Sequence, residues 1–293
     1  SGSVLLYEKN PCGNGSPLRY GDVRKIMKKY RIMVSDFDGT LATTDKKITA
    51  KTLLTIRDFV KRGGIFVVST GRMTAGIDHI LSAAGLNVLL SAYNGAEIKD
   101  LKTNKLLIRR AIDFETTAKV LEKAESFNLN MHCYGDDRFY VSKESRRSFF
   151  YSVLTGVKPE VHSVLSEFVR EKKLSSSKIL AFDDKEKLDA AFPAFKETFK
   201  NLEVTRSNAE QIDFNLKGVS KGSALKDIAA YYDSDISEIL AIGDAGNDLS
   251  MLEAAGFSVA MGNAPDYVKA ACDGVTSSCD DDGVALAIEK FCI

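Results

Sequence analysis

A short apolar run that ends in two aspartates constrains the fold more than any other stretch of this sequence. Residues 32–34 are Ile-Met-Val, Asp36 and Asp38 follow two positions apart, and Gly39-Thr40 comes next. Consecutive apolar residues of strand length predict a buried parallel strand, and the Asp, Gly and Thr residues predict the turn that ends it. Because ligands of open α/β sheets bind beyond the carboxyl ends of the strands, both carboxylates are expected at the ligand-binding edge.

Two neighbouring carboxylates repel one another unless a cation lies between them. Mg²⁺ suits such a site best, because it takes oxygen ligands and is usually held by one or two carboxylates together with phosphate. The alternative is a capped strand end with two solvated acids, and this is the commoner meaning of an isolated D-x-D. The longer D-x-D-G-T-L string and three later segments favour the functional interpretation.

Strands and helices alternate after this first strand. The spacing of apolar residues predicts helices over 49–62 and 73–84 and strands over 65–70 and 88–93, followed by a hairpin over 96–109. A β-α-β-α-β order implies a parallel sheet with right-handed crossovers. The sequence therefore predicts an α/β core domain built on a parallel sheet.

The pattern changes between residues 112 and 211, where the expected strands no longer end in polar motifs. Helices are expected over 114–127, 161–169 and 185–199, a hairpin over 132–141 and a strand over 179–182. The α/β pattern resumes at Ile212 with helices over 221–231, 249–255 and 284–291 and strands over 238–242 and 257–261. We therefore expect an N-terminal extension at 1–30 with a short basic helix over 22–30, a catalytic core domain at 31–111 and 212–293, and an inserted α+β cap domain at 112–211.

Composition excludes several classes of protein. A length of 293 residues favours two domains, and 40 basic against 40 acidic side chains make a broad nucleic-acid-binding surface improbable. The five cysteines are scattered without C-x-x-C spacing, which argues against a disulfide framework or a zinc site. No signal peptide is visible, and no apolar run approaches the roughly 18 residues that span a bilayer. We expect a cytoplasmic protein with no nucleic-acid and no membrane partner.

Asp36 and Asp38 suggest covalent chemistry on a phosphate ester. A carboxylate such as Asp36 can form an acyl phosphate and so divide one difficult displacement into two easier ones. Asp38 can protonate the leaving alkoxide and afterwards activate water, so that one group serves both half-reactions. The alternative for Asp38 is an ordinary turn-capping aspartate.

Two further segments offer phosphate ligands. Thr70 and Gly71 supply a hydroxyl and a backbone N–H before a predicted helix, where phosphate binds readily, although an ordinary helix cap is the simpler explanation. Arg72 is expected to be an exposed residue at the helix start, with a contact to phosphate as the alternative. Lys221 supplies a positive charge that can stabilise a phosphoryl group in its transition state, although one lysine among many is a weak signal. Asn94 at the end of the third strand is a further candidate for facing the substrate.

The second acidic strand end is Gly243-Asp244-Ala245-Gly246-Asn247-Asp248. Asp244 lies at the predicted strand end and can bind a metal directly, and Asp248 can ligate through water or orient another ligand. Asn247 can donate to a phosphoryl oxygen. Three carboxylates around one dication leave positions for water and phosphate, as Mg²⁺ requires.

Four motifs together resemble those of the haloacid dehalogenase-like hydrolases, and their wording is most similar to the Cof-type phosphatases. The motifs are D-F-D-G-T at 36–40, T-G-R at 70–72, S-K-G at 220–222 and G-D-A-G-N-D at 243–248. The resemblance covers about residues 31–293 and implies a Rossmann-like core domain with a cap inserted between the second and third motifs.

The resemblance also implies a role for each motif residue. Asp36 is the nucleophile and a Mg²⁺ ligand, Asp38 is the acid/base with its carbonyl on the metal, and Asp244 and Asp248 complete the metal site. The phosphoryl group is held by the Phe37 N–H and by Thr70, Gly71, Lys221 and Asn247.

The function expected from these residues is Mg²⁺-dependent hydrolysis of small phosphorylated metabolites, above all sugar phosphates, through an aspartyl-phosphate intermediate. A phosphomutase of the same superfamily and a non-catalytic regulator that binds a phosphometabolite are the alternatives. Substrate choice is assigned to the cap, where Arg138, His132 and Tyr140 are polar candidates that are more often simply surface or core residues. Substrate identity and oligomeric state are left open by the sequence.

Overall fold

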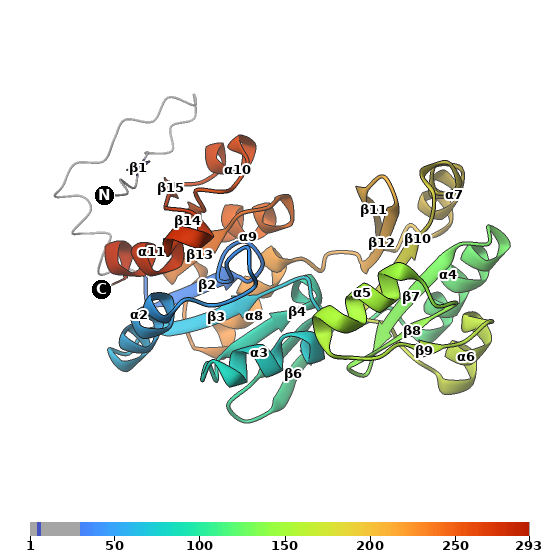
Figure 1. The fold of residues 1–293 in the computed structure, drawn as a ribbon, viewed down its shortest axis with the longest axis horizontal. Helices are drawn as coiled ribbons and strands as arrows, with labels where there is room; N and C mark the ends of the chain where they lie inside the picture. Colours follow the sequence, from blue (N-terminus) through green and yellow to red (C-terminus); the bar gives the residue numbers. More distant parts are fainter. Residues whose placement is uncertain (1–4, 7–29, 293) are drawn as a thin grey trace. The chain divides into compact units, whose positions relative to one another are not determined.

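The computed structural model describes residues 5–6 and 30–292 of the chain (Figure 1). The chain divides into two compact units. The first contains Ser1–Gly71, Ala84–Lys105 and Ser220–Ile293, and the second contains Arg72–Ala83 and Leu106–Val219.

The first unit is built on a largely parallel sheet. Its strands follow the order β1-β15-β14-β13-β2-β3-β4-β5-β6, with parallel pairing from β15 through to β4. The strands are β1 Leu5–Leu6, β2 Ile32–Asp36, β3 Ile65–Ser69, β4 Leu89–Ala92, β5 Glu97–Asp100, β6 Lys105–Arg109, β13 Ile239–Gly243, β14 Phe257–Ala260 and β15 Gly274–Val275. The division into units falls within β6, after Lys105. This confirms the predicted α/β fold class with a parallel-sheet core.

Helices cover this sheet because its strands are apolar on both faces. Every residue of β2 and β13 is buried, as expected for central parallel strands. Helix α2 packs against α11, and α8 packs against α9. The helices and 3₁₀ turns of this unit are α2 Ala50–Lys61, η2 Tyr93–Gly95, α8 Lys221–Tyr231, η3 Ile236–Glu238, η4 Gly246–Asp248, α9 Leu249–Ala254, α10 Asp266–Ala270, η5 Cys279–Asp281 and α11 Gly283–Phe291.

The second unit is an α+β body with its own apolar core. Its sheet has the order β11-β12-β10-β7-β8-β9, and all pairs except β8 with β9 are antiparallel. Its elements are η1 Thr74–Gly76, α3 Asp78–Ala83, α4 Phe114–Ser126, β7 Asn130–Gly135, β8 Arg138–Val141, α5 Arg146–Thr155, β9 Glu160–Val161, α6 Leu165–Lys172, β10 Lys178–Phe182, α7 Lys185–Thr198, β11 Leu202–Asn208 and β12 Gln211–Leu216. Residues from α4, α6 and α7 and from one face of the sheet form one buried cluster.

Several expected elements are confirmed, and the turn between β7 and β8 shows why. Asp136 and Asp137 both have positive φ, at 54° and 57°, which matches the right-handed twist of a two-residue hairpin. Asp tolerates this conformation better than most residues do. The hairpin expected over 96–109 is formed by β5 and β6.

Other expectations are wrong in detail. The helix expected over 73–84 is broken into η1 and α3, because Ile77 leaves helical geometry with φ at −131°. The helix expected over 161–169 begins only at Leu165, since Glu160 and Val161 pair with β8 as strand β9. The strand β12, which contains Ile212, was not among the expected elements, and it pairs with β10 and β11.

The N-terminal extension contains an unexpected strand. Leu5 and Leu6 pair antiparallel with Val275 and Gly274 of β15, although the extension at 1–30 was expected to precede every strand. The basic helix expected over 22–30 lies outside the described residues except for Tyr30. The expected domain boundaries at 111/112 and 211/212 remain a prediction.

His132 and Tyr140, two polar candidates of the expected cap, belong to the interior of the second unit. His132 is 1% exposed and packs edge-on against Phe182 at 4.7 Å between ring centroids, and Tyr140 is 7% exposed in the apolar cluster. Arg138 is exposed and pairs with Glu160. Burial, and then the nearby Arg147, lower the pKa of His132 to about 3.

This burial predicts an acid-sensitive second unit. The unfolded chain takes up a proton at His132 below about pH 6.5, whereas the folded chain resists it down to about pH 3. Stability is therefore full above pH 6.5 and falls with decreasing pH, by about 2 kcal/mol at pH 5. Urea unfolding of His132→Gln should show a correspondingly weaker loss between neutral and acid pH. His79→Gln, at an exposed histidine, is the matched control, and an equal loss in both variants would contradict the prediction.

Candidate active site

Three carboxylates from the first unit come together at the carboxyl edge of its sheet. Oxygen atoms of Asp36, Asp244 and Asp248 lie within 4.8 Å of one another. Asp36 is the last residue of β2, whereas Asp244 and Asp248 follow β13, the neighbouring parallel strand. The parallel pairing of these two strands therefore assembles acids that are more than 200 positions apart in the chain.

Lys221 lies among these acids. Its Nζ donates to Asp36 Oδ1 at 2.5 Å and to Asp248 Oδ1 at 2.6 Å, and its side chain is fully buried. Ser220 caps α8 by accepting from the Ser223 backbone N–H, which sets Lys221 as the first residue of the helix. A buried cation with two carboxylate partners is a fixed positive charge at the strand ends.

Burial and mutual repulsion raise the pKa of Asp36 to about 7, while Lys221 opposes the rise. Burial alone would lower the pKa of Lys221, but Asp36 and Asp248 outweigh it and raise the pKa above its ordinary value. The two pKa values depend on each other, because Lys221 and Asp36 are hydrogen-bonded to each other. The lysine is the charged partner, because a neutral amine would leave Asp248 buried without any compensating charge.

Asp248 has both carboxylate oxygens engaged. Oδ1 accepts from Lys221, and Oδ2 accepts from the backbone N–H groups of Asp244 and Ala245 at 3.0 and 2.9 Å. Through these hydrogen bonds Asp248 stabilises the turn after β13 and holds the Lys221 side chain in position. Fewer of its lone pairs are left for a direct contact with a metal ion.

Each carboxylate oxygen of Asp244 has a side-chain donor nearby. Thr40 Oγ1 donates to Oδ1 at 2.8 Å, and Asn263 Nδ2 lies 3.5 Å from Oδ2. Burial raises the pKa of Asp244, and the bond from Thr40 works against that rise. Gly39 has φ at +76°, and a Cβ there would lie 2.5 Å from Asp244 Oδ2, so only glycine permits this approach.

Asp38 lies outside the carboxylate cluster, on the turn that follows β2. Its Oδ1 accepts from Lys46 Nζ at 3.0 Å, and its side chain is about one-third exposed. Asp280 holds the loop that carries Lys46, because its carboxylate accepts from the backbone N–H and the hydroxyl of Thr44. An acid that remains in contact with solvent on a braced loop can exchange protons with a leaving group and with water.

Thr70 and Gly71 follow β3, whose Ser69 pairs in register with Asp36. Thr70 is buried, its N–H donates to Ser91 O, and its carbonyl accepts from Asn94 N at 2.9 Å. A Cβ on Gly71 would lie 2.9 Å from Asn94 Oδ1. Asn94 is left-handed, with φ at 55°, and this distance places its carboxamide beside Gly71 of the second predicted phosphate motif.

The other predicted residues lie in different surroundings. Phe37 is fully buried and follows Asp36, whereas Asn247 is exposed on η4, next to Asp248. Arg72 is 8% exposed, so the expectation of an exposed arginine is wrong. The segment after it does not begin an exposed helix. It forms η1, where the N–H groups of Met73 and Ala75 are bonded by Tyr151 and Asp137.

The donor set fits a hard dication. Three carboxylates with one lysine leave an excess of negative charge, and carboxylate oxygens are the ligands that Mg²⁺ prefers. Asp36 and Asp244 would hold the ion. Mg²⁺ bound there would supply positive charge for a transferring phosphoryl group.

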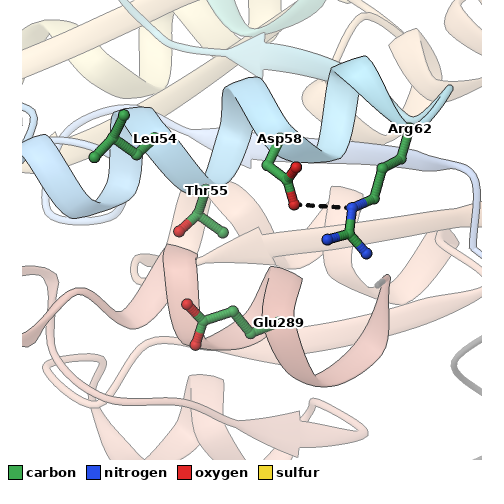
Figure 2. Close-up of a pocket in the computed structure, with 5 residues that line it drawn as sticks. All are labelled: Leu54, Thr55, Asp58, Arg62 and Glu289. Carbon is green, nitrogen blue, oxygen red and sulfur yellow. Dashed lines mark ion pairs between the residues drawn. The ribbon is translucent and has the colours of Figure 1, made fainter.

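A separate surface pocket carries none of these groups. It is lined by Leu54, Thr55 and Asp58 from α2, by Arg62 directly after that helix, and by Glu289 from α11 (Figure 2). Asp58 and Arg62 pair with each other across one helical turn at 2.9 Å. Because its charged side chains are exposed and largely paired, this pocket offers no arrangement for phosphate chemistry.

Comparison with known proteins places this arrangement in a family. A family model described as haloacid dehalogenase-like hydrolase matches residues 33–288. The chain belongs to the haloacid dehalogenase-like hydrolases. The resemblance seen in the four motifs is thereby confirmed.

Two of the following similar proteins are named as phosphatases, and the solved structure from Thermotoga maritima has no activity in its name. The 5-amino-6-(5-phospho-D-ribitylamino)uracil phosphatase YwtE of Bacillus subtilis is 30% identical over 281 residues, which cover 87% of this chain and 96% of that protein. The structure of TM0651 from Thermotoga maritima gives a TM-score of 0.81 at 30% identity, with 90% and 98% of the two chains covered. The haloacid dehalogenase subclass IIB sugar phosphatase BT4131 gives 0.75 at 25% identity, with 89% and 98% covered. The chain is accordingly a phosphatase of this family.

No helix among residues 5–6 and 30–292 is both long enough and apolar enough to cross a membrane.

Two residues of this haloacid dehalogenase-like site were not predicted from the sequence. Thr40 was predicted only as part of a motif, and Asn263 was not among the predicted site residues, yet both lie against Asp244. The signal for Asn263 was present, because it is the first polar residue after β14, the strand next to β13. Treating every strand end on the carboxyl edge as a candidate would have found it.

Proposed function

We propose that the protein is a Mg²⁺-dependent phosphatase that hydrolyses small phosphorylated metabolites, above all sugar phosphates, through an aspartyl-phosphate intermediate. The single observation that carries this proposal is the cluster of Asp36, Asp244 and Asp248 around the buried Lys221. A buried carboxylate beside a fixed cation is suited to attack phosphorus, because the developing charge on the phosphoryl oxygens is stabilised as it forms.

In the first half-reaction a carboxylate oxygen of Asp36 attacks phosphorus, and the bond to the ester oxygen breaks. The proton of the Asp38 carboxyl group passes to that departing oxygen, and the alcohol leaves. Lys221, Thr70, the N–H groups of Phe37 and Gly71, and Asn247 hold the phosphoryl oxygens during transfer.

In the second half-reaction the Asp38 carboxylate takes a proton from water, and the resulting hydroxide oxygen bonds to phosphorus. The acyl-phosphate bond breaks, inorganic phosphate leaves, and the Asp36 carboxylate is restored. The proton taken from water returns Asp38 to its protonated starting state, so that it can protonate the next leaving group. The partial exposure of Asp38 supports this role, because the same group must reach both leaving group and water.

A polyhydroxylated leaving group is supported by the relatives. One relative is named as a phosphatase of a phosphoribityl compound, and one structural neighbour as a sugar phosphatase. Asn94 supports the same class, because its Oδ1 is buried without a hydrogen-bond partner among the described residues and can accept from a substrate hydroxyl. We assign choice of the leaving group to the cap predicted at 112–211.

The proposal is tested by phosphate release from p-nitrophenyl phosphate, followed by a panel of phosphate esters ranked by kcat/KM. We expect turnover that requires Mg²⁺ and that is fastest with sugar and polyol phosphates. Phosphate transferred to a second sugar phosphate, and not to water, would identify a phosphomutase. Tight binding of esters without any turnover would identify a regulator and contradict the enzyme proposal.

A further inference from the structure

We propose that Asn263 is a positioning residue whose carboxamide fixes the direction of the Asp244 carboxylate. This inference rests on the proposed function, because it assigns Asn263 a task in holding the cation of the same site. Asn263 lies beyond the end of β14, in the loop that follows Gly262.

The orientation of the Asn263 carboxamide follows from its neighbours. A backbone N–H can only donate, and that of Cys279 lies 2.9 Å from Asn263 Oδ1. The amide oxygen must therefore face Cys279, and Nδ2 must face the other way. Nδ2 there donates to the Gly39 carbonyl at 2.9 Å and lies 3.5 Å from Asp244 Oδ2.

Thr40 supplies the second side-chain donor to the Asp244 carboxylate. Its hydroxyl donates to Asp244 Oδ1 at 2.8 Å, so that each oxygen of Asp244 faces a different donor. The Gly39 backbone lies against the same carboxylate, and a single added Cβ there would approach Oδ2 to 2.5 Å. Two donors and this close backbone contact restrict rotation of the carboxylate about its last torsion.

The three contacts of Asn263 join segments that are far apart in the sequence. Gly39 belongs to the loop after β2, Asp244 follows β13, and Cys279 begins η5. Cys279 is itself 6% exposed, so Asn263 is anchored to a buried part of the first unit. A carboxamide held by these contacts is already ordered, so it loses little conformational entropy when Asp244 binds a cation.

Residues that orient a metal ligand influence metal affinity strongly, and their loss typically costs about 10- to 100-fold. A side chain that only stabilises the fold would lower the melting temperature and leave the affinity unchanged. Affinity for Mg²⁺, measured without substrate or turnover, therefore separates positioning from packing.

The test compares Asn263→Ala and Thr40→Val, singly and together, with wild type. Asn263→Ala removes the Nδ2 donor, and Thr40→Val removes the hydroxyl with almost no change of shape. Asn87→Asp, at an exposed asparagine of the first unit, is the control for a change remote from the site. Isothermal titration with Mg²⁺ alone gives the dissociation constants, and thermal unfolding without Mg²⁺ reports on the fold.

We expect Asn263→Ala to weaken Mg²⁺ binding about 10- to 100-fold and Thr40→Val to weaken it by a similar factor. Because both donors orient one carboxylate, the effects in the double variant should not simply multiply. In turnover assays the Mg²⁺ concentration for half-maximal rate should rise, while KM for the ester stays close to wild type.

A lower melting temperature with unchanged Mg²⁺ affinity in Asn263→Ala would overturn the inference and leave the proposed function intact. If the factors by which Asn263→Ala and Thr40→Val weaken Mg²⁺ binding simply multiply in the double variant, the two residues do not orient the same carboxylate, and the inference is contradicted. Absence of Mg²⁺ binding by the wild-type chain would overturn the metal dependence of the proposed function and this inference with it.

Discussion

Asp36→Asn should abolish phosphate release, with kcat reduced by roughly four to six orders of magnitude, as for other enzymes that lose their nucleophile. Asparagine has the same shape as aspartate, but its amide cannot form the acyl phosphate through which the reaction is proposed to pass. Steady-state assays on p-nitrophenyl phosphate check the rate. Acid-quenched protein incubated with a labelled ester checks for covalently bound phosphate, which should be absent in Asp36→Asn.

The fold should survive this substitution. Because burial raises the pKa of Asp36 from its ordinary 3.8 to about 7, its ionisation opposes folding in full above about pH 7, and this cost declines as the pH falls from about 7 to 3.8. Without Mg²⁺, Asp36→Asn should therefore be at least as stable as wild type above about pH 7. Full activity in Asp36→Asn would exclude Asp36 as the nucleophile, and an inactive but unfolded variant would not support the assignment.

Lys221→Met has the second large expected effect, because it removes a buried cation from between two carboxylates. Lys221 donates to Asp36 at 2.5 Å and to Asp248 at 2.6 Å with no exposed side-chain surface. Removing one partner of a buried ion pair costs about 3–5 kcal/mol, since the remaining charge is left without compensation. Loss of a fixed cation at the phosphoryl oxygens should also lower kcat by about 10²- to 10³-fold.

Lys226→Met is the matched control, since Lys226 lies on the same helix but is exposed. Urea unfolding and ester hydrolysis should both remain near wild type in that variant. Equal stability of Lys221→Met and Lys226→Met would show that the buried lysine does not balance the charge of Asp36 and Asp248. Loss of stability without loss of rate would instead limit Lys221 to a structural role.

The secondary structure around the site could be predicted because each strand carries a strong local pattern. β2, β3, β4, β13 and β14 are short apolar runs that stop at small or polar residues, and their parallel pairing brings those ends to one edge. The hairpin of β7 and β8 was predictable for the same reason, since Asp136 and Asp137 accept positive φ.

Local pattern failed where a long-range contact overrode it. Helical spacing over 73–84 did not show that Tyr151 and Asp137 bond the N–H groups of Met73 and Ala75. Apolar Val161 matched a helix but pairs with Val141 of β8. In both cases a partner distant in the sequence decided the local structure.

The amino-acid sequence by itself determined the chemistry of this phosphatase: which acids end the strands, which lysine starts a helix, and the family to which the motifs belong. Only the tertiary structure decided how these groups are paired. In the folded chain Lys221 donates to Asp36 and Asp248, and both carboxylate oxygens of Asp248 accept hydrogen bonds. Thr40 and Asn263 lie against the carboxylate of Asp244. The physical reason is that residue type and spacing fix where a side chain leaves the backbone, whereas its partners depend on the register between strands that fold together from distant parts of the chain.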